Sequence, residues 1–428
     1  MRFIYTLLLY CLLPVILLRL VYRSIKNPAY SQRVPERFGF MGAKARNHGI
    51  KKGGIWVHAV SVGEAIAAIK LIKALQEEYP EQSMTVTCGT PTGSEIIQNQ
   101  LGSSVFHVYF PYDYPGSVRR FLSVVKPRLG IIMETELWPN LFHKASSSGV
   151  KILISNMRLS DGSFKNYQKF SKLASSTFEQ VDQFLVQTET DAKRAIVLGA
   201  EAEKVSIVGN LKFDLDRAGL LDKAQKAILQ TQFNLDRLTW LAGSTHAGED
   251  EIILSVHQQL LKTWPNLLLI IAPRHPERFE TVLQLAKQSF NTQKRSLISP
   301  ENVLASTTQV LIADSMGELN QFIQISDWAF IGGSLVPVGG HNILEACAAS
   351  VPVIFGQHMQ NFRQIAQRVK IAEAGIQVSD ELGLCEACKA FAAHSSERVK
   401  MGQNGRVLMA QHQGTLGKTM ILIKSLMS

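Results

Sequence analysis

Residues 331–345 read IGGSLVPVGGHNILE, which is the most informative stretch of the chain. It predicts a buried strand that ends in a glycine-rich loop, followed by the first turn of a helix that carries Glu345. Glycine allows the backbone to turn sharply and to approach a ligand closely, and the start of a helix attracts an anion. An acidic residue near such a loop binds ribose hydroxyls in other doubly wound nucleotide sites. We therefore infer a nucleotide ligand with a negatively charged phosphate.

Short apolar segments alternate with helical patterns on both sides of this stretch. In the first half of the chain they span 54–61, 84–88, 105–110, 129–133, 151–155, 181–187 and 205–208. In the second half they span 239–242, 267–272, 310–313, 328–331 and 351–355. Strands that alternate with helices in this way predict doubly wound parallel sheets.

The length of the chain sets the number of domains. Because 428 residues exceed what one hydrophobic core supports, we expect an α/β protein with two Rossmann-like domains that face a central cleft. We assign residues 25–213 to the first domain, residues 214–237 to a more polar linker, and residues 238–428 to the second domain. Residues 1–24 precede both domains and differ from them in kind.

The N-terminal residues 3–18, FIYTLLLYCLLPVILL, are uncharged and almost wholly apolar. Such a run approaches the lower limit for spanning the hydrocarbon core of a bilayer. A cleaved signal peptide would need a small-residue cleavage site, which the following residues do not supply; a buried core helix is the other alternative. Arg19 and Arg23 follow the run, so the positive-inside rule leaves the body of the protein in the cytoplasm. We predict an uncleaved membrane-anchor helix.

The overall composition narrows the class of protein. Charged residues make up 19% and hydrophobic residues 46%, which fits a folded protein and argues against long disorder. The formal net charge of +10 suits an anionic lipid surface or a phosphorylated substrate, and no nucleic-acid partner is expected because no nucleic-acid-binding motif accompanies it. Five scattered cysteines suit a reducing compartment. Cys385 and Cys388 form a C-x-x-C pair without the second ligand pair of a zinc site, so we expect no metal.

In the first half, charged side chains follow the ends of predicted strands. Ser61-Val-Gly-Glu64 places a carboxylate at a strand-to-helix turn, where it could be a general base for a sugar hydroxyl or could simply stabilise the helix N-terminus. Glu134 and Glu136 follow the strand at 129–133 and could hold an acceptor sugar or stabilise a transition state; ordinary capping is the alternative. Lys212, in a Gly-Asn-Leu-Lys setting, could neutralise a departing phosphate.

In the second half, four strand ends converge on one predicted nucleotide pocket. Residues 242–246 end the first strand with small hydrogen-bond donors, and Pro273 and Arg274 end the next with a forked, permanently charged guanidinium. Met316-Gly317-Glu318 ends a third strand, where its backbone could contact a nucleobase. The glycine-rich loop and Asn342-Ile343-Leu344-Glu345 complete the set. This convergence is more specific than any single element, because ligands bind at the carboxyl ends of parallel strands.

Six motifs occur in an order that resembles a known family. Together they resemble the 3-deoxy-D-manno-octulosonic acid (Kdo) transferases of lipopolysaccharide biosynthesis, and the resemblance covers nearly the whole chain. The motifs are Ser61-Val-Gly-Glu64, Glu134-Thr-Glu-Leu-Trp-Pro-Asn140, Gly209-Asn-Leu-Lys-Phe-Asp214, Ala272-Pro-Arg-His275, Met316-Gly-Glu318 and Gly340-His-Asn-Ile-Leu-Glu345. The resemblance implies a GT-B glycosyltransferase with an acceptor domain first and a donor domain second.

The resemblance also implies a reaction and its partners. Kdo would pass from CMP-Kdo to the glucosamine disaccharide of a lipid A precursor (lipid IVA), with inversion at the anomeric carbon. No cofactor and no metal are implied, since CMP-Kdo is the donor substrate. The implied location is the cell inner membrane, with the catalytic domains on the cytoplasmic side against anionic lipid.

Individual roles follow from the same resemblance. Glu64 matches the general base of the family, and Glu134 and Lys212 match residues that stabilise the transition state. The implied CMP contacts are Pro273, Arg274, Met316, Gly317, Glu318, Asn342, Ile343, Leu344 and Glu345. The chain departs from the family after Arg158-Leu-Ser160, where an Arg-Ser pair is usual and Asp161-Gly162-Ser163 stands instead. Lys165 or a neighbour would then have to replace that arginine if it binds an acceptor phosphate.

Other functions remain as alternatives. One is a different membrane-anchored GT-B transferase that uses a UDP-sugar. Another is a non-catalytic lipid-binding GT-B homologue, against which the intact Glu64, Glu134 and Lys212 argue. A dinucleotide oxidoreductase is disfavoured because no G-x-G-x-x-G follows the first strand.

Overall fold

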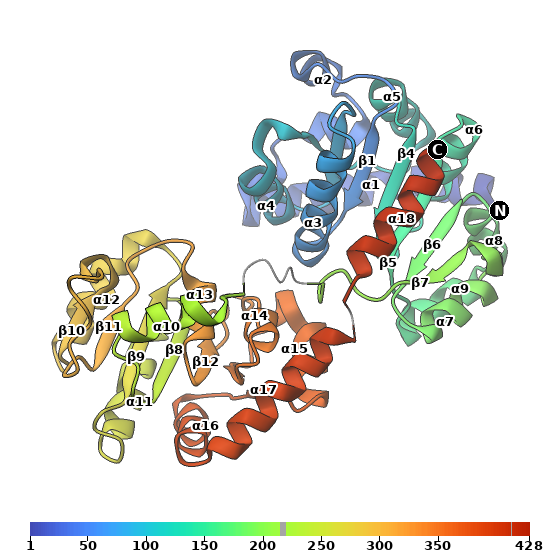
Figure 1. Ribbon diagram of the computed structural model, residues 1–428. Coiled ribbons are helices and arrows are strands. Elements are labelled where there is room, and N and C mark those ends of the chain that lie inside the picture. The colour runs from blue at the N-terminus through green and yellow to red at the C-terminus, as the bar shows by residue number, and fades with distance from the viewer. Residues whose placement is uncertain (215–219, 412) are drawn as a thin grey trace. The chain divides into compact units, whose positions relative to one another are not determined.

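The computed structural model of the chain describes residues 1–214, 220–411 and 413–428. These residues form two compact units, each built on a parallel β-sheet with helices on both of its faces (Figure 1). Unit 1 contains residues 1–214 and 414–428, and unit 2 contains the chain between them. Residues 215–219, which belong to the predicted linker 214–237, lie outside the described residues.

The sheet of unit 1 has the strand order β3-β2-β1-β4-β5-β6-β7, with every described pairing parallel. The strands are β1 (Ile55–Ala59), β2 (Met84–Cys88), β3 (Phe106–Tyr109), β4 (Leu129–Met133), β5 (Lys151–Met157), β6 (Gln183–Val186) and β7 (Val205–Ile207). The strand order reverses between the neighbours β1 and β4. In doubly wound folds ligands bind at this switch point, outside the carboxyl ends of the strands.

The helices of unit 1 bury apolar side chains on both faces of this sheet. They are α1 (Arg2–Lys26), α2 (Gly42–His48), α3 (Val62–Glu78), α4 (Pro91–Leu101), α5 (Pro115–Val125), α6 (Pro139–Ser147), α7 (Asp161–Lys169), α8 (Ser171–Phe178), α9 (Glu189–Val197) and α18 (Thr415–Met427). Trp56 and Phe121 belong to the core on one face, and Val57 and Leu71 to the core on the other. Because both faces are covered, the central strands read as continuous apolar runs in the sequence.

The sheet of unit 2 has the order β10-β11-β9-β8-β12-β13-β14, again with parallel pairings. Its strands are β8 (Thr239–Thr245), β9 (Leu268–Pro273), β10 (Thr292–Lys294), β11 (Val310–Ile312), β12 (Trp328–Ile331), β13 (Val353–Phe355) and β14 (Gly375–Gln377). The switch point lies between β8 and β12. The predicted α/β class is confirmed, but the sequence did not indicate the two edge strands, β10 and β14.

The helices of unit 2 flank this second sheet. They are α10 (Lys223–Gln232), α11 (Asp250–Leu261), α12 (Phe279–Lys287), α13 (Leu319–Gln324), α14 (Leu344–Ala348), α15 (Arg363–Ile371), α16 (Glu381–Ala393) and α17 (Ser395–Ala410). Cys385 and Cys388, the C-x-x-C pair, are buried on α16 in the core of this unit. α10 falls inside the predicted linker 214–237, yet it belongs to unit 2.

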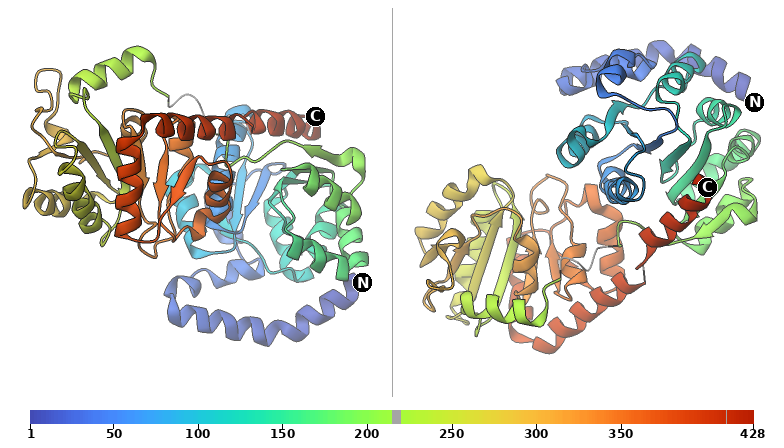
Figure 2. Two further views of the ribbon diagram at one scale, coloured as in Figure 1. Left: turned by 90° about the horizontal axis from the view of Figure 1, so that it is seen from below. Right: turned by 45° about the horizontal axis from the view of Figure 1, so that its top comes forward.

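The C-terminal helix α18 corrects one predicted domain boundary. We expected residues 238–428 to form the second domain, but residues 414–428 belong to unit 1. Ile423 and Met427 lie in the same apolar core as Leu71 of α3, and Arg128 donates a hydrogen bond from Nη2 to the Ser428 carbonyl at 3.2 Å. Figure 2 shows the red helix α18 beside the blue and green elements of unit 1. An apolar helical pattern does not reveal which core will bury it.

The predicted membrane anchor forms the single long helix α1, which runs along one side of unit 1 (Figure 2). Among the described residues it is the one helix long and apolar enough to cross a membrane. One side of α1 contacts the unit: Thr6 Oγ1 donates to Asn140 Oδ1 at 3.0 Å, and the Tyr114 hydroxyl donates to the Leu9 carbonyl at 3.0 Å. Most of its large apolar side chains are exposed. α1 therefore presents an apolar surface while one of its sides packs on the unit.

Candidate active site

The two strands at the switch point of unit 1 both lead into loops that carry carboxylates. β1 leads through Val60 into α3, which carries Glu64, and β4 leads directly into Glu134 and Glu136. The charges of Glu134 and of Lys212 are close enough to shift the pKa of Glu64. The structure thus brings together the three residues that the sequence predicted to be catalytic, from three separate segments of unit 1.

Glu64 lies in the first turn of α3 with its carboxylate folded back over the helix start. Oε1 accepts a hydrogen bond from the Ser61 hydroxyl at 2.7 Å, and Oε2 accepts one from the Val60 amide at 2.8 Å. Ser61 Oγ in turn accepts from the Glu64 amide at 3.3 Å, so the pair caps the helix reciprocally. Burial, and after it the nearby Glu134 carboxylate, raises the pKa of Glu64. The carboxylate is held in place and is more basic than an ordinary one, which suits a general base.

Glu134 and Lys212 form an ion pair at the same edge of the sheet, with 2.7 Å between Lys212 Nζ and Glu134 Oε1. Glu134 has a left-handed backbone, with φ of 57°, although it is not glycine. Such a conformation costs energy and is found preferentially at functional sites. The Glu134 amide donates to the Ser155 carbonyl at 2.8 Å, which fixes the turn. The ammonium of Lys212 is therefore held by a carboxylate rather than by bulk water.

A network of buried amide side chains positions the loop that carries Lys212. Asn210 Oδ1 accepts from the Lys212 amide at 2.9 Å, while its Nδ2 donates to Gln187 Oε1 at 2.9 Å. Gln187 donates to the Asn156 carbonyl at 3.0 Å, and Asn156 Oδ1 accepts from the Leu211 amide at 3.0 Å. Asn156 also has a left-handed backbone, with φ of 57°. The network joins the ends of β5 and β6 to the Lys212 loop, and the sequence did not reveal these contacts.

Glu136 is the third carboxylate at this edge. Burial, then the charges of Glu64 and Glu134, raises its pKa to about 7. Glu136 also faces Tyr167 of α7, since burial and then the Glu136 charge raise the pKa of that phenol to about 12. The alternative that we left open, a simple cap on the following helix, does not apply: α6 has Trp138 as its N-cap residue, with no side-chain cap hydrogen bond.

The segment that departs from the family pattern begins α7. Ser160 Oγ accepts a hydrogen bond from the Ser163 amide at 3.1 Å, which caps the helix. The Asp161 carboxylate is paired with Arg194 of α9. Lys165, the predicted substitute for the missing arginine, lies on α7 with an exposed side chain. The structure thus gives Asp161 a partner of its own.

The glycine-rich loop of unit 2 follows β12 as predicted, but its amides are used differently. Glu249, at the start of α11 and fully buried, accepts from the amides of Gly333 at 2.7 Å, Ser334 at 3.0 Å and Leu335 at 2.9 Å. A Cβ at Gly332 would lie 2.6 Å from the Ser244 carbonyl, so glycine is needed there for close packing. These loop amides therefore bind a side chain of the protein itself. No pattern in the sequence indicated this role of Glu249.

Three histidines surround this loop. His246 Nε2 and His341 Nε2 are 2.8 Å apart, so the N–H of one ring donates a hydrogen bond to the nitrogen of the other. The rings are stacked with centroids 5.1 Å apart, and His275 meets His246 edge-on at 5.4 Å. Burial, followed by the charges of His246 and Arg274, lowers the pKa of His341 to about 4. The sequence indicated the loops that carry these histidines, at the ends of β8, β9 and β12, but not that the rings meet.

The residues predicted to contact CMP lie at the end of β9 and in the segments that follow β9, β11 and β12 of unit 2. Pro273 ends β9, and Arg274 follows it with an exposed side chain. Glu318 forms an ion pair with Arg295 at 2.9 Å, and Met316 is 57% exposed. Gly317, between them, has a left-handed backbone with φ of 89°.

The motif at the end of the glycine-rich loop forms the start of a short helix, α14. Asn342 Nδ2 donates to Glu345 Oε1 at 3.1 Å, and its Oδ1 accepts from the Leu344 amide at 3.2 Å. Ile343 and Leu344 are buried and anchor the motif in the unit. The first turn of α14 therefore carries a carboxylate, as the sequence predicted, although the helix has only five residues.

Comparison with known proteins identifies the family. The family model described as 3-deoxy-D-manno-octulosonic-acid transferase (kdotransferase) matches residues 32–215. The 3-deoxy-D-manno-octulosonic acid transferase of Haemophilus influenzae is 42% identical to this chain, covering 99% of it and 98% of the relative. The enzyme of the same name from Bordetella pertussis is 32% identical, covering 98% of each. The chain belongs to the 3-deoxy-D-manno-octulosonic acid transferase family.

Membership of the Kdo transferase family confirms the resemblance and makes this protein a glycosyltransferase. A solved structure of UDP-GlcNAc 2-epimerase from Neisseria meningitidis bound to UDP-GlcNAc aligns with a TM-score of 0.50. It is 13% identical and covers 87% of this chain and 99% of its own, so the likeness shows the fold alone. With two parallel-sheet units of Rossmann type, the predicted GT-B class is confirmed.

Proposed function

We propose that this protein transfers Kdo from CMP-Kdo to a lipid A precursor in lipopolysaccharide core assembly, with inversion at the anomeric carbon. The observation that carries the proposal is the cluster of Glu64, Glu134 and Lys212 at the switch point of unit 1. Family membership supports the donor. The proposal involves no metal ion and no cofactor.

The chemistry needs a base and a stabilised leaving group. Glu64 takes the proton from an acceptor hydroxyl while the oxygen attacks the anomeric carbon of Kdo, and CMP leaves with the electrons of the broken bond. Inversion requires one displacement on the face opposite the leaving phosphate, so a single base is sufficient. Glu134 stabilises positive charge that develops on the sugar ring, and Lys212 stabilises negative charge on the departing phosphate.

The donor is assigned to unit 2. Arg274 would meet the phosphate, Glu345 the ribose hydroxyls, and the backbone of residues 316–318 the cytosine. Support comes from the position of these residues after the carboxyl ends of β9, β11 and β12, in the sheet whose switch point lies between β8 and β12. The left-handed backbone of Ser244, with φ of 56°, lies at the same edge and supports this assignment, because such strained residues cluster at functional sites.

The acceptor is assigned to unit 1, beside the membrane helix. An apolar pocket of about 400 Å³ lies between α1 and the elements around α8. Ile4, Leu8 and Leu12 line it from α1, and Leu137 and Phe170 line it from the unit. A fatty-acyl chain fits this lining, and Leu137 directly follows Glu136 of the carboxylate cluster. Arg19 and Arg23 after the apolar run favour an anionic, cytoplasmic membrane face, which we take to be that of the cell inner membrane.

A donor and acceptor assay tests the proposal. The full-length protein in detergent is incubated with a defined bisphosphorylated lipid A precursor and either CMP-Kdo or UDP-sugars, and the lipid product is weighed by mass spectrometry. A product heavier by Kdo, formed only from CMP-Kdo, is expected. Product formed only from a UDP-sugar would instead make the protein a different GT-B transferase.

A further inference from the structure

A second cavity of unit 1, of about 530 Å³, lies between α1 and the carboxyl ends of the strands at the switch point. One wall is formed by α1, whose apolar Ile16 and Leu20 alternate with Arg19 and Arg23. The opposite wall comes from the ends of β1, β2, β3 and β4 with the loops after them, and from Tyr30 and Arg37 in the segment between α1 and α2. The cavity is therefore apolar and basic along the membrane helix and polar at the edge of the sheet.

Three side chains on the sheet wall have buried polar atoms without a hydrogen-bond partner among the described residues. They are Arg37 at Nε and Nη2, His58 at Nε2 and Trp138 at Nε1. Arg37 is 5% exposed and His58 is fully buried. Buried polar atoms without partners are rare and costly, and an arginine with two such nitrogens costs most because it is charged. Three of them around one cavity indicate that a polar ligand belongs there.

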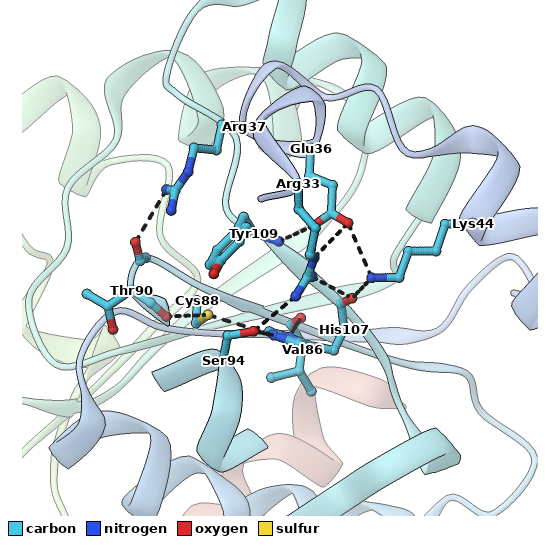
Figure 3. Close-up of polar contacts among 11 residues, drawn as sticks. Arg33, Glu36, Arg37, Lys44, Val86, Cys88, Thr90, Ser94, His107 and Tyr109 are labelled. Atoms are coloured by element: carbon cyan, nitrogen blue, oxygen red, sulfur yellow. Dashed lines mark hydrogen bonds and ion pairs between the residues drawn. The ribbon is translucent and has the colours of Figure 1, made fainter. Parts of the chain in front are cut away.

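Arg37 is held rigidly although part of its guanidinium is unpaired (Figure 3). It lies over the ring of Tyr109 at 4.2 Å and donates from Nη1 to the Gly89 carbonyl at 3.3 Å. The neighbouring Arg33 lies on the same ring at 4.6 Å but is paired with Glu36 at 2.8 Å. The buried carboxylate of Glu36 therefore pairs with Arg33, and the contacts of Arg37 are with neutral groups.

The one acidic side chain that lines the cavity is also engaged. Asp113 Oδ2 accepts from the Asn140 amide at 3.0 Å, and Oδ1 accepts from the Leu141 amide at 2.8 Å, at the start of α6. Burial raises the pKa of Asp113 to about 7, although the two amides at the start of the helix favour its charged form, so it adds little negative charge. The cavity therefore retains an excess of positive charge from Arg19, Arg23 and Arg37. The planar guanidinium fork of Arg37 matches a carboxylate or a phosphate, and the phosphate is the group that the proposed lipid acceptor carries.

We propose that this cavity binds the phosphate-bearing headgroup of the lipid acceptor, with the fork of Arg37 on the phosphate and with Arg19 and Arg23 at the membrane side. The inference rests on the proposed function and adds the place and the chemistry of acceptor recognition. Val60 lines the cavity, and its amide donates to Glu64 Oε2 at 2.8 Å, so the headgroup would reach the loop that holds the base. A lipid is favoured over free phosphate because the apolar face of α1 forms one wall.

The test measures binding separately from transfer, using full-length protein in detergent. The probes are the bisphosphorylated lipid A precursor, the same lipid after enzymatic dephosphorylation, and inorganic phosphate. Arg37→Gln and Arg23→Gln are compared with Arg119→Gln, an exposed arginine of α5 in the same unit. We expect Arg37→Gln to weaken binding of the phosphorylated lipid about tenfold or more, and to leave binding of the dephosphorylated lipid unchanged. Arg119→Gln should change neither.

Each outcome decides one claim. If Arg37→Gln does not fold, judged by its thermal unfolding, the exposed Arg23→Gln carries the test with a smaller loss of the same preference. The inference is overturned if both variants still prefer the phosphorylated lipid to the dephosphorylated one. It is also overturned if inorganic phosphate competes for the site as well as the lipid does. If the protein prefers the phosphorylated lipid as expected but does not transfer Kdo, the inference about the cavity is supported and only the proposed function is contradicted.

Discussion

Lys212 Nζ lies 2.7 Å from Glu134 Oε1, and this ion pair ties the loop beyond β7 to the end of β4. Both residues lie close to Glu64. Burial and the charge of Glu134 raise the pKa of Glu64, and the charge of Lys212 lowers it. The pair therefore contributes to the basicity of the proposed base, after burial, and fixes the position of the Lys212 ammonium. Because the three side chains interact, substitutions at them are not expected to have additive effects.

Glu64→Gln should lower kcat by roughly 10²- to 10⁴-fold, the usual contribution of a positioned base. Glutamine keeps an oxygen that can accept from the Val60 amide, so the fold and CMP binding should persist. Steady-state kinetics and CMP titration check this, with Glu77→Gln on the exposed side of α3 as the matched control. Unchanged turnover in Glu64→Gln would exclude it as the base.

Lys212→Ala should reduce turnover more than it reduces affinity for CMP. The charge matters most as the phosphate departs, and an interaction made only in the transition state appears in kcat. Comparing kcat with the Kd for CMP measures the difference, and Lys193→Ala, an exposed lysine of α9, serves as control. Equal losses in both quantities would make Lys212 a plain binding residue.

The sequence predicted the buried parts of the fold better than its edges. Apolar runs at the central strands, such as Ile131 and Ile132 of β4, predict strands because both faces of the sheet are covered. The edge strands β10 and β14 are three residues long and half-buried, so they carry no such run. α18 was assigned to the wrong unit because its apolar pattern indicates that the helix is buried but does not indicate which core buries it.

The residues of the candidate site also differed in how well the sequence predicted them. Glu64, Glu134 and Lys212 were predicted because each follows an apolar strand within a few residues and lies in a motif of the family that the chain resembles. Glu249 was not, because a carboxylate that accepts three loop amides from 84 to 86 residues away looks like any acidic residue at a helix start. The unpaired nitrogens of Arg37 also depend on the tertiary structure, since Glu36 beside it could have paired with either arginine.

Glu136→Gln should raise stability at alkaline pH. With its pKa raised to about 7, Glu136 holds a proton in the folded state that the unfolded chain releases near its ordinary carboxyl pKa. The stability of the native state therefore falls as pH rises from the ordinary value to about 7. Removing the carboxyl should increase the Tm at pH 8 by at least about 2 °C and change it little at pH 4. Glu95→Gln, exposed on α4, is the control, and an equal shift at both pH values would contradict the assignment.

Glu345→Ala should weaken CMP binding with a smaller effect on turnover at saturating donor. The substitution removes the carboxylate that is proposed to contact the ribose hydroxyls. Hydrogen bonds to a charged group contribute about 1.5–3 kcal/mol to binding. Isothermal titration with CMP measures the loss against Glu251→Ala, an exposed residue of α11. Because Asn342 Nδ2 donates to Glu345 Oε1, the circular dichroism of the variant should be recorded as well. An unchanged affinity would refute the ribose assignment.

Ile423→Ala should destabilise unit 1, although the residue lies near the end of the chain. Ile423 is fully buried in the core that α18 shares with β1 and α3, and deleting such a side chain costs about 2–5 kcal/mol. Ile421, two positions earlier on the same helix, is 68% exposed, so Ile421→Ala should change the stability by less than about 0.5 kcal/mol. Thermal unfolding of the two variants compares them directly. If unit 2 binds CMP as proposed, the transition that shifts should be the one that CMP does not stabilise, because α18 belongs to unit 1. A shift in the CMP-stabilised transition would contradict the assignment of α18 to unit 1.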